Sequence, residues 1–209
     1  MLDAALIAKC ADPSLKPAVV EKFVKAAGSP DPLAITVRSG NRIVLVPKPA
    51  NAEEALAIIR ENVAHSVVRV GVTQFPAGLG AKEVTDLKPD LVDACENLRM
   101  GTRMFAKVMR IIAKWYGNPK SDEVFPQIFE DAVFAWKSGE FEGTNVFLAD
   151  DAAVEWKPPE VTAETPADEP EDDPQDDDQP KKAADAAEED GAPDNANMRI
   201  DLSRIGGGQ

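Results

Sequence analysis

Apolar residues recur at helical spacing in five stretches of the chain. In one of the clearest, Val20, Phe23, Val24 and Ala27 follow the i, i+3, i+4, i+7 pattern that places side chains on one buried face. Prolines and glycines separate the stretches, as expected where an X-Pro step or a glycine turn ends a helix. The pattern therefore predicts helices over residues 2–10, 17–27, 50–64, 91–115 and 122–137.

β-branched residues gather after the second predicted helix. Residues 34–38 and 42–47 flank a Ser39-Gly-Asn41 turn, a pattern that predicts a small β-hairpin. Residues 66–74 are also apolar and β-branched, and they form either a strand or an extended wall segment. With five helices and one hairpin, the predicted fold class is mainly α with a small β component.

The chain changes character after residue 156. Residues 1–156 carry 18 Lys and Arg against 21 Asp and Glu, whereas residues 157–209 carry 5 against 16. A stretch so rich in Pro, Asp and Glu cannot bury enough apolar area to offset the entropy of ordering it. We therefore expect a folded domain at residues 1–156 and a disordered acidic tail at residues 157–209. Apolar spacing returns at residues 198–205, which either form a short docking peptide or carry apolar residues by chance.

Composition argues against several classes of function. A lone histidine, His65, and the absence of any Cys/His spacing typical of zinc predict no metal and no cofactor. No run approaches the ~18 to 20 apolar residues that span a bilayer, so no membrane insertion is expected. One face of the long predicted helix carries a row of basic residues, but the surrounding domain is slightly acidic. We therefore interpret this row as a solvent-exposed helix face and expect no nucleic-acid partner. The row consists of Arg99, Arg103, Lys107 and Arg110.

Two cysteines bear on the compartment of the protein. Cys10 and Cys95 either form one disulfide or remain buried thiols, and a disulfide would indicate an oxidising compartment. The first ten residues lack the basic start and the apolar run of a secretory signal. Three options stay open: a cytoplasmic protein, a signal removed from this sequence, or export by another route.

A series of short motifs covers most of the predicted domain. In chain order they are Cys10-Ala-Asp-Pro13, Pro32-Leu-Ala-Ile35, Pro49-Ala-Asn-Ala-Glu-Glu-Ala55, His65-Ser-Val67, Gly71-Val-Thr-Gln74, Asp93-Ala-Cys95-Glu-Asn97-Leu98-Arg-Met-Gly101 and Ala135-Trp-Lys-Ser-Gly139. The ordered set resembles the VirB-type lytic transglycosylases encoded with type IV secretion and conjugation systems. The resemblance implies a lysozyme-like α+β fold, periplasmic residence, and peptidoglycan and type IV secretion components as partners. It also implies that Cys10 and Cys95 lie close together, because the first helix should pack near the start of the long one.

The departures from this family fall on its chemistry. The family breaks the glycan β-1,4 bond with a general-acid glutamate, and counting back from Pro32 places Ala27 at that position. The family's Tyr-Asn pair is Trp136-Lys137 here, whereas its glutamine is retained as Gln74. The resemblance therefore implies a glycan groove that contains Gly71, Gln74 and Trp136 but no intact catalytic residue.

Two carboxylates are candidates for a displaced acid. Asp31 lies in the following loop, and Glu21 lies six residues before Ala27, about 240° around the helix and facing away from it. Three functions follow: a catalytically silent, peptidoglycan-associated relative, an active transglycosylase with a displaced acid, and an interaction protein that recruits a basic partner through the acidic tail. It is equally open whether Ala27, Gln74 and Trp136 line a groove or simply pack in a scaffold.

Overall fold

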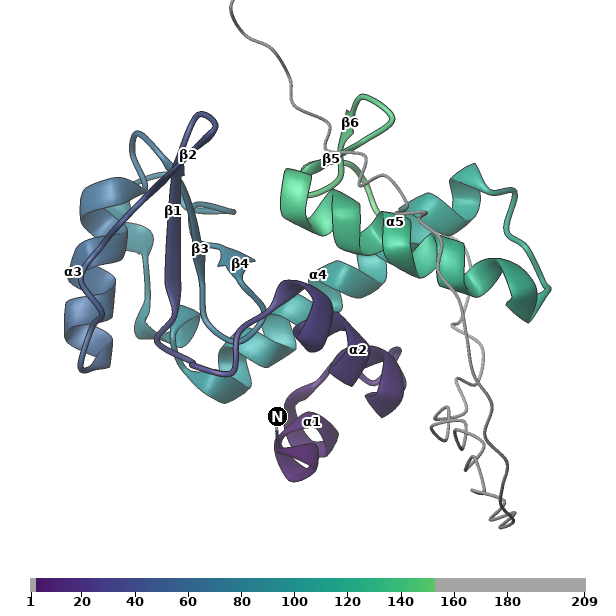
Figure 1. The fold of residues 1–209 in the computed structure, drawn as a ribbon, viewed down its shortest axis with the longest axis horizontal. Helices are drawn as coiled ribbons and strands as arrows, with labels where there is room; N and C mark the ends of the chain where they lie inside the picture. The colour runs from purple at the N-terminus through teal and green to yellow at the C-terminus, as the bar shows by residue number, and fades with distance from the viewer. Residues whose placement is uncertain (1–2, 153–209) are drawn as a thin grey trace, which may run out of the picture. The chain divides into compact units, whose positions relative to one another are not determined.

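The computed structural model describes residues 3–152 (Figure 1). Residues 153–209 lie outside the described part, and with them the predicted acidic tail, its docking peptide and the function assigned to it. Five α-helices account for much of residues 3–152, and they correspond to the five predicted ones. They are α1 (Ala4–Cys10), α2 (Pro17–Ala27), α3 (Ala52–Asn62), α4 (Ala94–Trp115) and α5 (Phe125–Ser138).

Local sequence signals explain where these helices begin and end. The Asn51 side chain accepts a hydrogen bond from Glu54 N and caps α3. The long helix starts at Ala94, later than predicted, because Pro89–Leu91 forms a separate 3-10 turn and Asp93 caps α4 by accepting from Cys95 N and Glu96 N. Gly139 ends α5 in the left-handed conformation that favours glycine, with φ of 89°.

Four antiparallel strands form the main sheet. They are β1 (Ile35–Ser39), β2 (Arg42–Val44), β3 (Val67–Val70) and β4 (Phe75–Pro76), in the order β2-β1-β3-β4. β1 pairs with β2 through the predicted turn and with β3 in the register Ile35↔Val70 to Arg38↔Val67. A second sheet pairs β5 (Glu140–Phe141) with β6 (Thr144–Asn145).

This sheet shows that the predicted fold class was wrong. The expected fold was mainly α, of the lysozyme-like α+β kind, with one small hairpin as its whole β part. Residues 3–152 instead form an α+β fold around a four-stranded antiparallel sheet, with a second two-stranded sheet. The reason lies in residues 67–70, whose backbone groups need hydrogen-bond partners and find them on the free edge of β1. The hairpin thus gains a third strand, and Phe75–Pro76 adds a fourth.

The two faces of the sheet have opposite character. Val37, Val68 and Val70 are buried on the face that α3 contacts, and α3 turns Ala55, Leu56 and Ile59 towards the core. Because side chains alternate along a strand, Thr36, Arg38, Val67 and Arg69 share the other face. That second face forms one wall of the groove described below.

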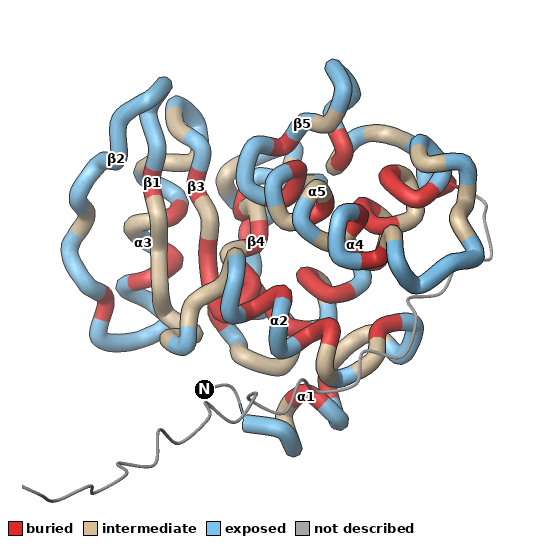
Figure 2. The backbone as a smooth tube through the Cα atoms, turned by 45° about the vertical axis from the view of Figure 1, so that its right-hand side comes forward, coloured by how far each residue is buried: buried red, intermediate tan, exposed pale blue. Residues whose placement is uncertain are grey.

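An aromatic cluster fills the space between the helices. Phe23 of α2 stacks on Phe105 of α4 with ring centroids 3.9 Å apart, and the Trp136 ring of α5 lies edge-on to Phe23 at 5.2 Å. Figure 2 shows buried residues (red) concentrated where these three helices come together and along β3. Among residues 3–152, no helix is long and apolar enough to cross a membrane.

Candidate functional site

The loop Gly71–Gln74 joins β3 to β4 at the place where α2, α4 and α5 converge. The Ser29 N–H, just beyond α2, donates to the Val72 carbonyl at 3.0 Å. From α5, the indole Nε1 of Trp136 donates to the Thr73 carbonyl, also at 3.0 Å. The loop is therefore fixed from two sides by bonds to its own backbone.

Asn97 of α4 fixes the loop from a third side. Its Oδ1 accepts from Thr73 N at 2.9 Å and from Thr73 Oγ1 at 2.8 Å. Its Nδ2 donates to the carbonyls of Val70 at 3.0 Å and Leu91 at 2.7 Å. Asn97 has no exposed surface, and these four bonds use the capacity of its amide.

Two glycines allow this close approach. Gly71 has φ of +73°, and a Cβ on it would lie 2.3 Å from Asn97 Nδ2. A Cβ on Gly101 of α4 would lie 2.2 Å from Thr73 Oγ1, closer than real carbon contacts allow. The Gly71-Val-Thr-Gln74 and Asn97…Gly101 motifs, which are 20 or more residues apart along the chain, therefore meet as one packed unit.

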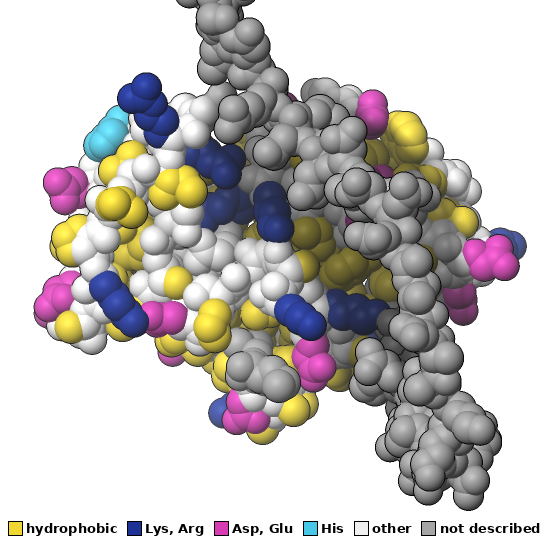
Figure 3. Space-filling view, in the orientation of Figure 1, with side chains coloured by type: hydrophobic (Ala, Val, Ile, Leu, Met, Phe, Trp, Pro, Cys, Tyr) yellow, Lys and Arg dark blue, Asp and Glu magenta, His cyan; other side chains and the backbone are white. Residues whose placement is uncertain are grey.

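A groove of about 380 Å³ opens beside this unit. One wall is the polar face of β1 and β3, and the other is formed by the ends of α2 and α5. Figure 3 shows Lys and Arg side chains gathered in the middle of this side of the molecule. The groove is lined by Ala27, Thr36, Arg38, Gly40, Val67, Arg69, Gln74, Trp136, Lys137 and Ser138.

The structure brings together most of the predicted site residues. Ala27, Gln74 and Trp136 line the same groove, and Gly71 supports it from behind by accepting a hydrogen bond from Gln74 Nε2 at 3.1 Å. Gln74 Oε1 accepts from Thr36 Oγ1 at 2.7 Å, so both ends of its amide are engaged within the protein. Gln74 adopts φ of 51°, unusual for a residue with a side chain, and these two bonds hold it there.

Trp136 forms the floor of the groove rather than a surface for stacking. Its side chain is fully buried, with 0% of its area exposed. The ring packs edge-on against Phe23 and Phe147, and its N–H is bonded to Thr73. Of the two roles left open by the sequence, this geometry assigns Trp136 to the core.

None of the residues lining the groove is a carboxylate. Glu21 is exposed on α2 and does not line the groove. Asp31 lies outside it as well, paired with Lys48 Nζ at 3.2 Å. The Leu33 N–H hydrogen bond, aided by Lys48, outweighs the effect of burial and holds the pKa of Asp31 below its usual value. A general acid needs the opposite shift.

The charged residues that do line the groove are basic. The Arg69 guanidinium donates to the carbonyls of Gln74 at 3.2 Å and Lys137 at 3.1 Å, and its Cζ lies 5.5 Å from the centre of the Phe147 ring. Burial, together with the neighbouring Arg38, lowers the pKa of Arg69 to about 10. The sequence reasoning missed Arg38 and Arg69. The available signal was the spacing of two within each segment, which places Thr36 with Arg38 and Val67 with Arg69 on one side of a strand. It shows that the two arginines share a sheet face only once β1 and β3 are known to pair.

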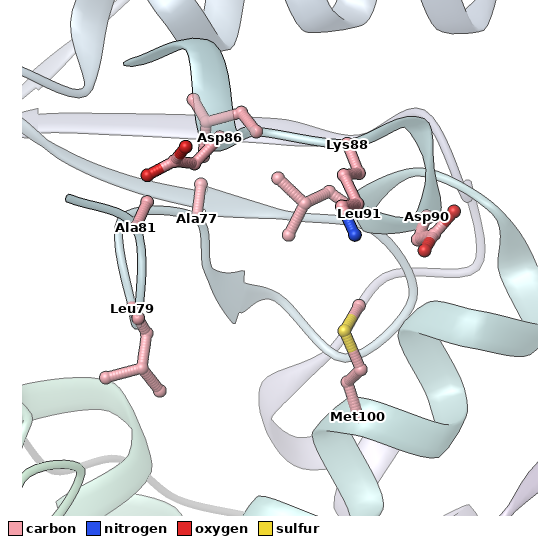
Figure 4. Close-up of a pocket in the computed structure, with 10 residues that line it drawn as sticks. Ala77, Leu79, Ala81, Asp86, Lys88, Asp90, Leu91 and Met100 are labelled. Atoms are coloured by element: carbon pink, nitrogen blue, oxygen red, sulfur yellow. The ribbon is translucent and has the colours of Figure 1, made fainter. Parts of the chain in front are cut away.

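A second, smaller pocket of about 200 Å³ lies between α4 and the loops at residues 77–91. Its walls are largely apolar, with Met100 projecting from α4 towards the segment that carries Leu91 (Figure 4). Asp86 lies at its edge, where its Oδ2 accepts from Lys82 N and Glu83 N at 3.1 Å. This carboxylate is occupied by its own loop, and the other charged residues of the lining, Lys88 and Asp90, are exposed. Within residues 3–152 no cluster of His, Cys, Asp or Glu is arranged to hold a metal ion.

A disulfide joins the end of α1 to the first turn of α4. Cys10 and Cys95, the pair for which the sequence left two options, are bonded with S–S 2.00 Å and Cα atoms 5.2 Å apart. The bond lies at the same end of α4 as Asn97, so it anchors the helix start that holds the Gly71–Gln74 loop.

Comparison with known proteins places the chain in a family. The TraH_2 family model matches residues 1–207, and the chain belongs to this family, which is associated with conjugal transfer and type IV secretion. The chain is 59% identical over 207 residues to the uncharacterized protein y4dP of Sinorhizobium fredii, covering 99% of this chain and 100% of that protein. No solved structure matches it. The predicted link to conjugation and type IV secretion is thus confirmed, whereas a relationship to lytic transglycosylases stays a prediction.

Proposed function

We propose that this protein is a peptidoglycan-associated component of a conjugal transfer apparatus that binds the glycan strand without cleaving it. The observation that carries the proposal is the groove itself. The motifs that resemble the lytic transglycosylases, including Gly71–Gln74 and Ala135 to Gly139, converge on it, and Ala27 stands where that family has its acid.

The absence of cleavage follows from the groove's chemistry. Breaking a glycosidic bond requires a carboxylic acid within hydrogen-bond reach of the leaving oxygen. The methyl group of Ala27 has no proton to give, and the lining residues include no Asp or Glu. Asp31, the nearer of the two candidate replacements in sequence, is held ionised by Leu33 and Lys48.

The groove retains features that suit binding. Its volume of about 380 Å³ falls within the usual range of ligand pockets. The exposed side chains of Arg38 and Lys137 offer hydrogen-bond donors at its rim, whereas the Ser138 hydroxyl is bonded to the carbonyls of Phe134 and Glu140. Gln74 and Thr36 are bonded to each other, so they shape the wall instead of offering free groups.

The disulfide supports a location where peptidoglycan is accessible. Bonds such as Cys10–Cys95 persist mainly in oxidising compartments, including the bacterial periplasm. Periplasmic residence is accordingly part of the proposal.

Co-sedimentation of the full-length protein with purified peptidoglycan sacculi tests this function. The matched pair of variants is Val67→Glu, on an exposed residue that lines the groove, and Ile43→Glu, on an exposed residue of the same sheet face outside it. We expect the wild type and Ile43→Glu to sediment with the sacculi and Val67→Glu to stay in solution. Equal binding by both variants would place the contact elsewhere, and no binding by the wild type would remove the proposal.

A further inference from the structure

Three cationic side chains converge on the groove from two walls. Arg38 and Arg69 come from neighbouring strands of one sheet face, two residues apart in register, since Arg69 pairs with Thr36. Lys137 comes from the last turn of α5 on the opposite wall. The backbone carbonyl of Lys137 accepts from Arg69 Nη2 at 3.1 Å, which joins the two walls at this point.

These cations have no acidic partner within residues 3–152. The ion pairs of the described part involve other residues: Lys48 with Asp31, Arg99 with Glu96, and Arg110 with Asp151. Arg69 donates to two carbonyls, which carry no net charge. Neither the Arg38 nor the Lys137 side chain hydrogen-bonds or pairs with any group of the described part.

Such an arrangement is unusual for this chain. Residues 1–156 carry slightly more acidic than basic residues, yet no carboxylate lines this groove. A partly buried guanidinium without a counter-charge costs free energy that an incoming anion would offset. A concave surface lined by charges of one sign also focuses their field and raises the local concentration of the opposite ion.

We propose that Arg38, Arg69 and Lys137 form a carboxylate-recognition subsite, which binds the free carboxylates on the peptide substituents of a peptidoglycan strand. This proposal rests on the function proposed above and names the groups that the groove recognises. A guanidinium matches a carboxylate with two parallel hydrogen bonds, and an ammonium adds a point charge at the rim.

Carboxylates fit the site better than a nucleic-acid backbone does. A phosphate chain needs a track of basic residues that continues beyond one site, because its affinity comes from many neutralised charges. Here the three cations are confined to a groove of about 380 Å³ on a domain of slightly negative net charge. A ligand with one or two carboxylates per repeating unit matches that layout.

Chemically amidated sacculi, in which free carboxyl groups have been converted to neutral amides, provide the test. Binding of the full-length protein to amidated and untreated sacculi is compared by quantitative co-sedimentation. The test variant is the double substitution Arg38→Gln/Lys137→Gln, which spares Arg69 and its bonds to the backbone. The control is Arg42→Gln/Lys114→Gln, which removes one exposed Arg from the same hairpin and one exposed Lys from the last turn of another helix.

We expect amidation to weaken wild-type binding about tenfold, the usual effect of losing one charge-assisted hydrogen bond. The test variant should bind untreated sacculi about tenfold more weakly and lose less affinity on amidation than the wild type does, since only Arg69 of the three cations remains. The control should behave as the wild type. Full-strength binding by the test variant, or by the wild type to amidated sacculi, overturns the subsite and leaves the proposed function standing.

Two further outcomes also decide the matter. If an oligo-deoxythymidine displaces the protein from untreated sacculi more effectively than a soluble muropeptide, the groove recognises phosphate chains and the proposal is overturned. If the test variant binds more tightly than the wild type, an anion of the chain itself occupies the cations, which also overturns it. A wild type that binds neither kind of sacculus removes the proposed function and this inference together.

Discussion

Asn97 Oδ1 accepts two hydrogen bonds from Thr73, one from its backbone N–H at 2.9 Å and one from its hydroxyl at 2.8 Å. The carbonyl of the same Thr73 accepts from Trp136 Nε1 at 3.0 Å. A single loop residue thereby connects α4 to α5, and its neighbour Gln74 lines the groove. The shape of the groove wall depends on this buried polar contact.

Removing the Asn97 amide should therefore destabilise the fold strongly. Asn97→Ala removes the acceptor of the Thr73 N–H and the amide donor to the carbonyls of Val70 and Leu91, and leaves the Thr73 hydroxyl only its longer bond to the backbone carbonyl of residue 97. Each buried polar group left unpaired costs roughly 1–3 kcal/mol, so we expect a loss of about 3–4 kcal/mol in the free energy of unfolding, measured in urea. Asn62→Ala, at the end of α3, removes one half-buried bond and should cost about 1 kcal/mol or less. Equal losses for the two variants would show that the Asn97 amide contributes no more stability than an ordinary half-buried hydrogen bond.

Gly101→Ala should also destabilise the protein, although alanine is the better helix former. The added Cβ would meet Thr73 Oγ1 at 2.2 Å and force α4 away from the loop. Overpacking of this kind costs about 1–3 kcal/mol, which exceeds or matches the ~1 kcal/mol that alanine gains in helix propensity. Urea unfolding should show a lower midpoint for Gly101→Ala and an almost unchanged one for Lys114→Ala, an exposed position on the same helix. A raised midpoint for Gly101→Ala would mean that the Gly71–Gln74 loop can shift to accommodate the added Cβ at little cost, which contradicts the tight packing inferred for Gly101.

Reduction of the disulfide should lower stability substantially. Cys10 and Cys95 are separated by 85 residues, and in the chain-entropy model a closed loop of that size contributes about 4–5 kcal/mol. Urea unfolding with and without a reducing agent measures the difference. The double variant Cys10→Ser/Cys95→Ser should be as weak as the reduced protein and insensitive to the reductant. A thiol assay on the native protein should detect no free Cys10 or Cys95, and full reactivity of both would contradict the bond.

Asp31 should contribute a small pH-dependent stability. Because its pKa is lowered in the folded state, its contribution is present above the ordinary pKa of 3.8 and is lost as the pH falls through the folded value. With 36% of the side chain exposed, we expect only a few tenths of a kcal/mol. Asp31→Asn should reduce the acid sensitivity of unfolding below about pH 4, measured by urea unfolding at a series of pH values. An unchanged acid sensitivity in Asp31→Asn would show that other groups account for the loss of stability at low pH.

Helix positions were predictable because their signal is local. The spacing of Val20, Phe23 and Val24, the Asn51 cap and the turn at Gly40 each determine nearby backbone without reference to distant residues. The pairing of β1 with β3 joins segments about 30 residues apart, and neither segment's sequence determines which strand it will pair with. For that reason the sheet was underestimated and the fold class was wrong.

Part of the candidate site was predictable from the order of its motifs. Motif order suggested that Ala27, Gln74 and Trp136 belong together, and all three line one groove. Sequence alone did not separate a core role from a groove role for Trp136, since that depends on its bond to Thr73. Arg38 and Arg69 went unnoticed because two arginines 31 positions apart become neighbours only through strand register.

The most direct test of the central claim is one incubation of the full-length protein with purified peptidoglycan. The pellet is assayed for protein, and the supernatant is searched by mass spectrometry for anhydro-muropeptides. A groove that binds without a proton donor predicts protein in the pellet and no anhydro products. Anhydro products that disappear in Asp31→Asn or Glu21→Gln would contradict the claim, because a displaced carboxylate would then supply the missing acid.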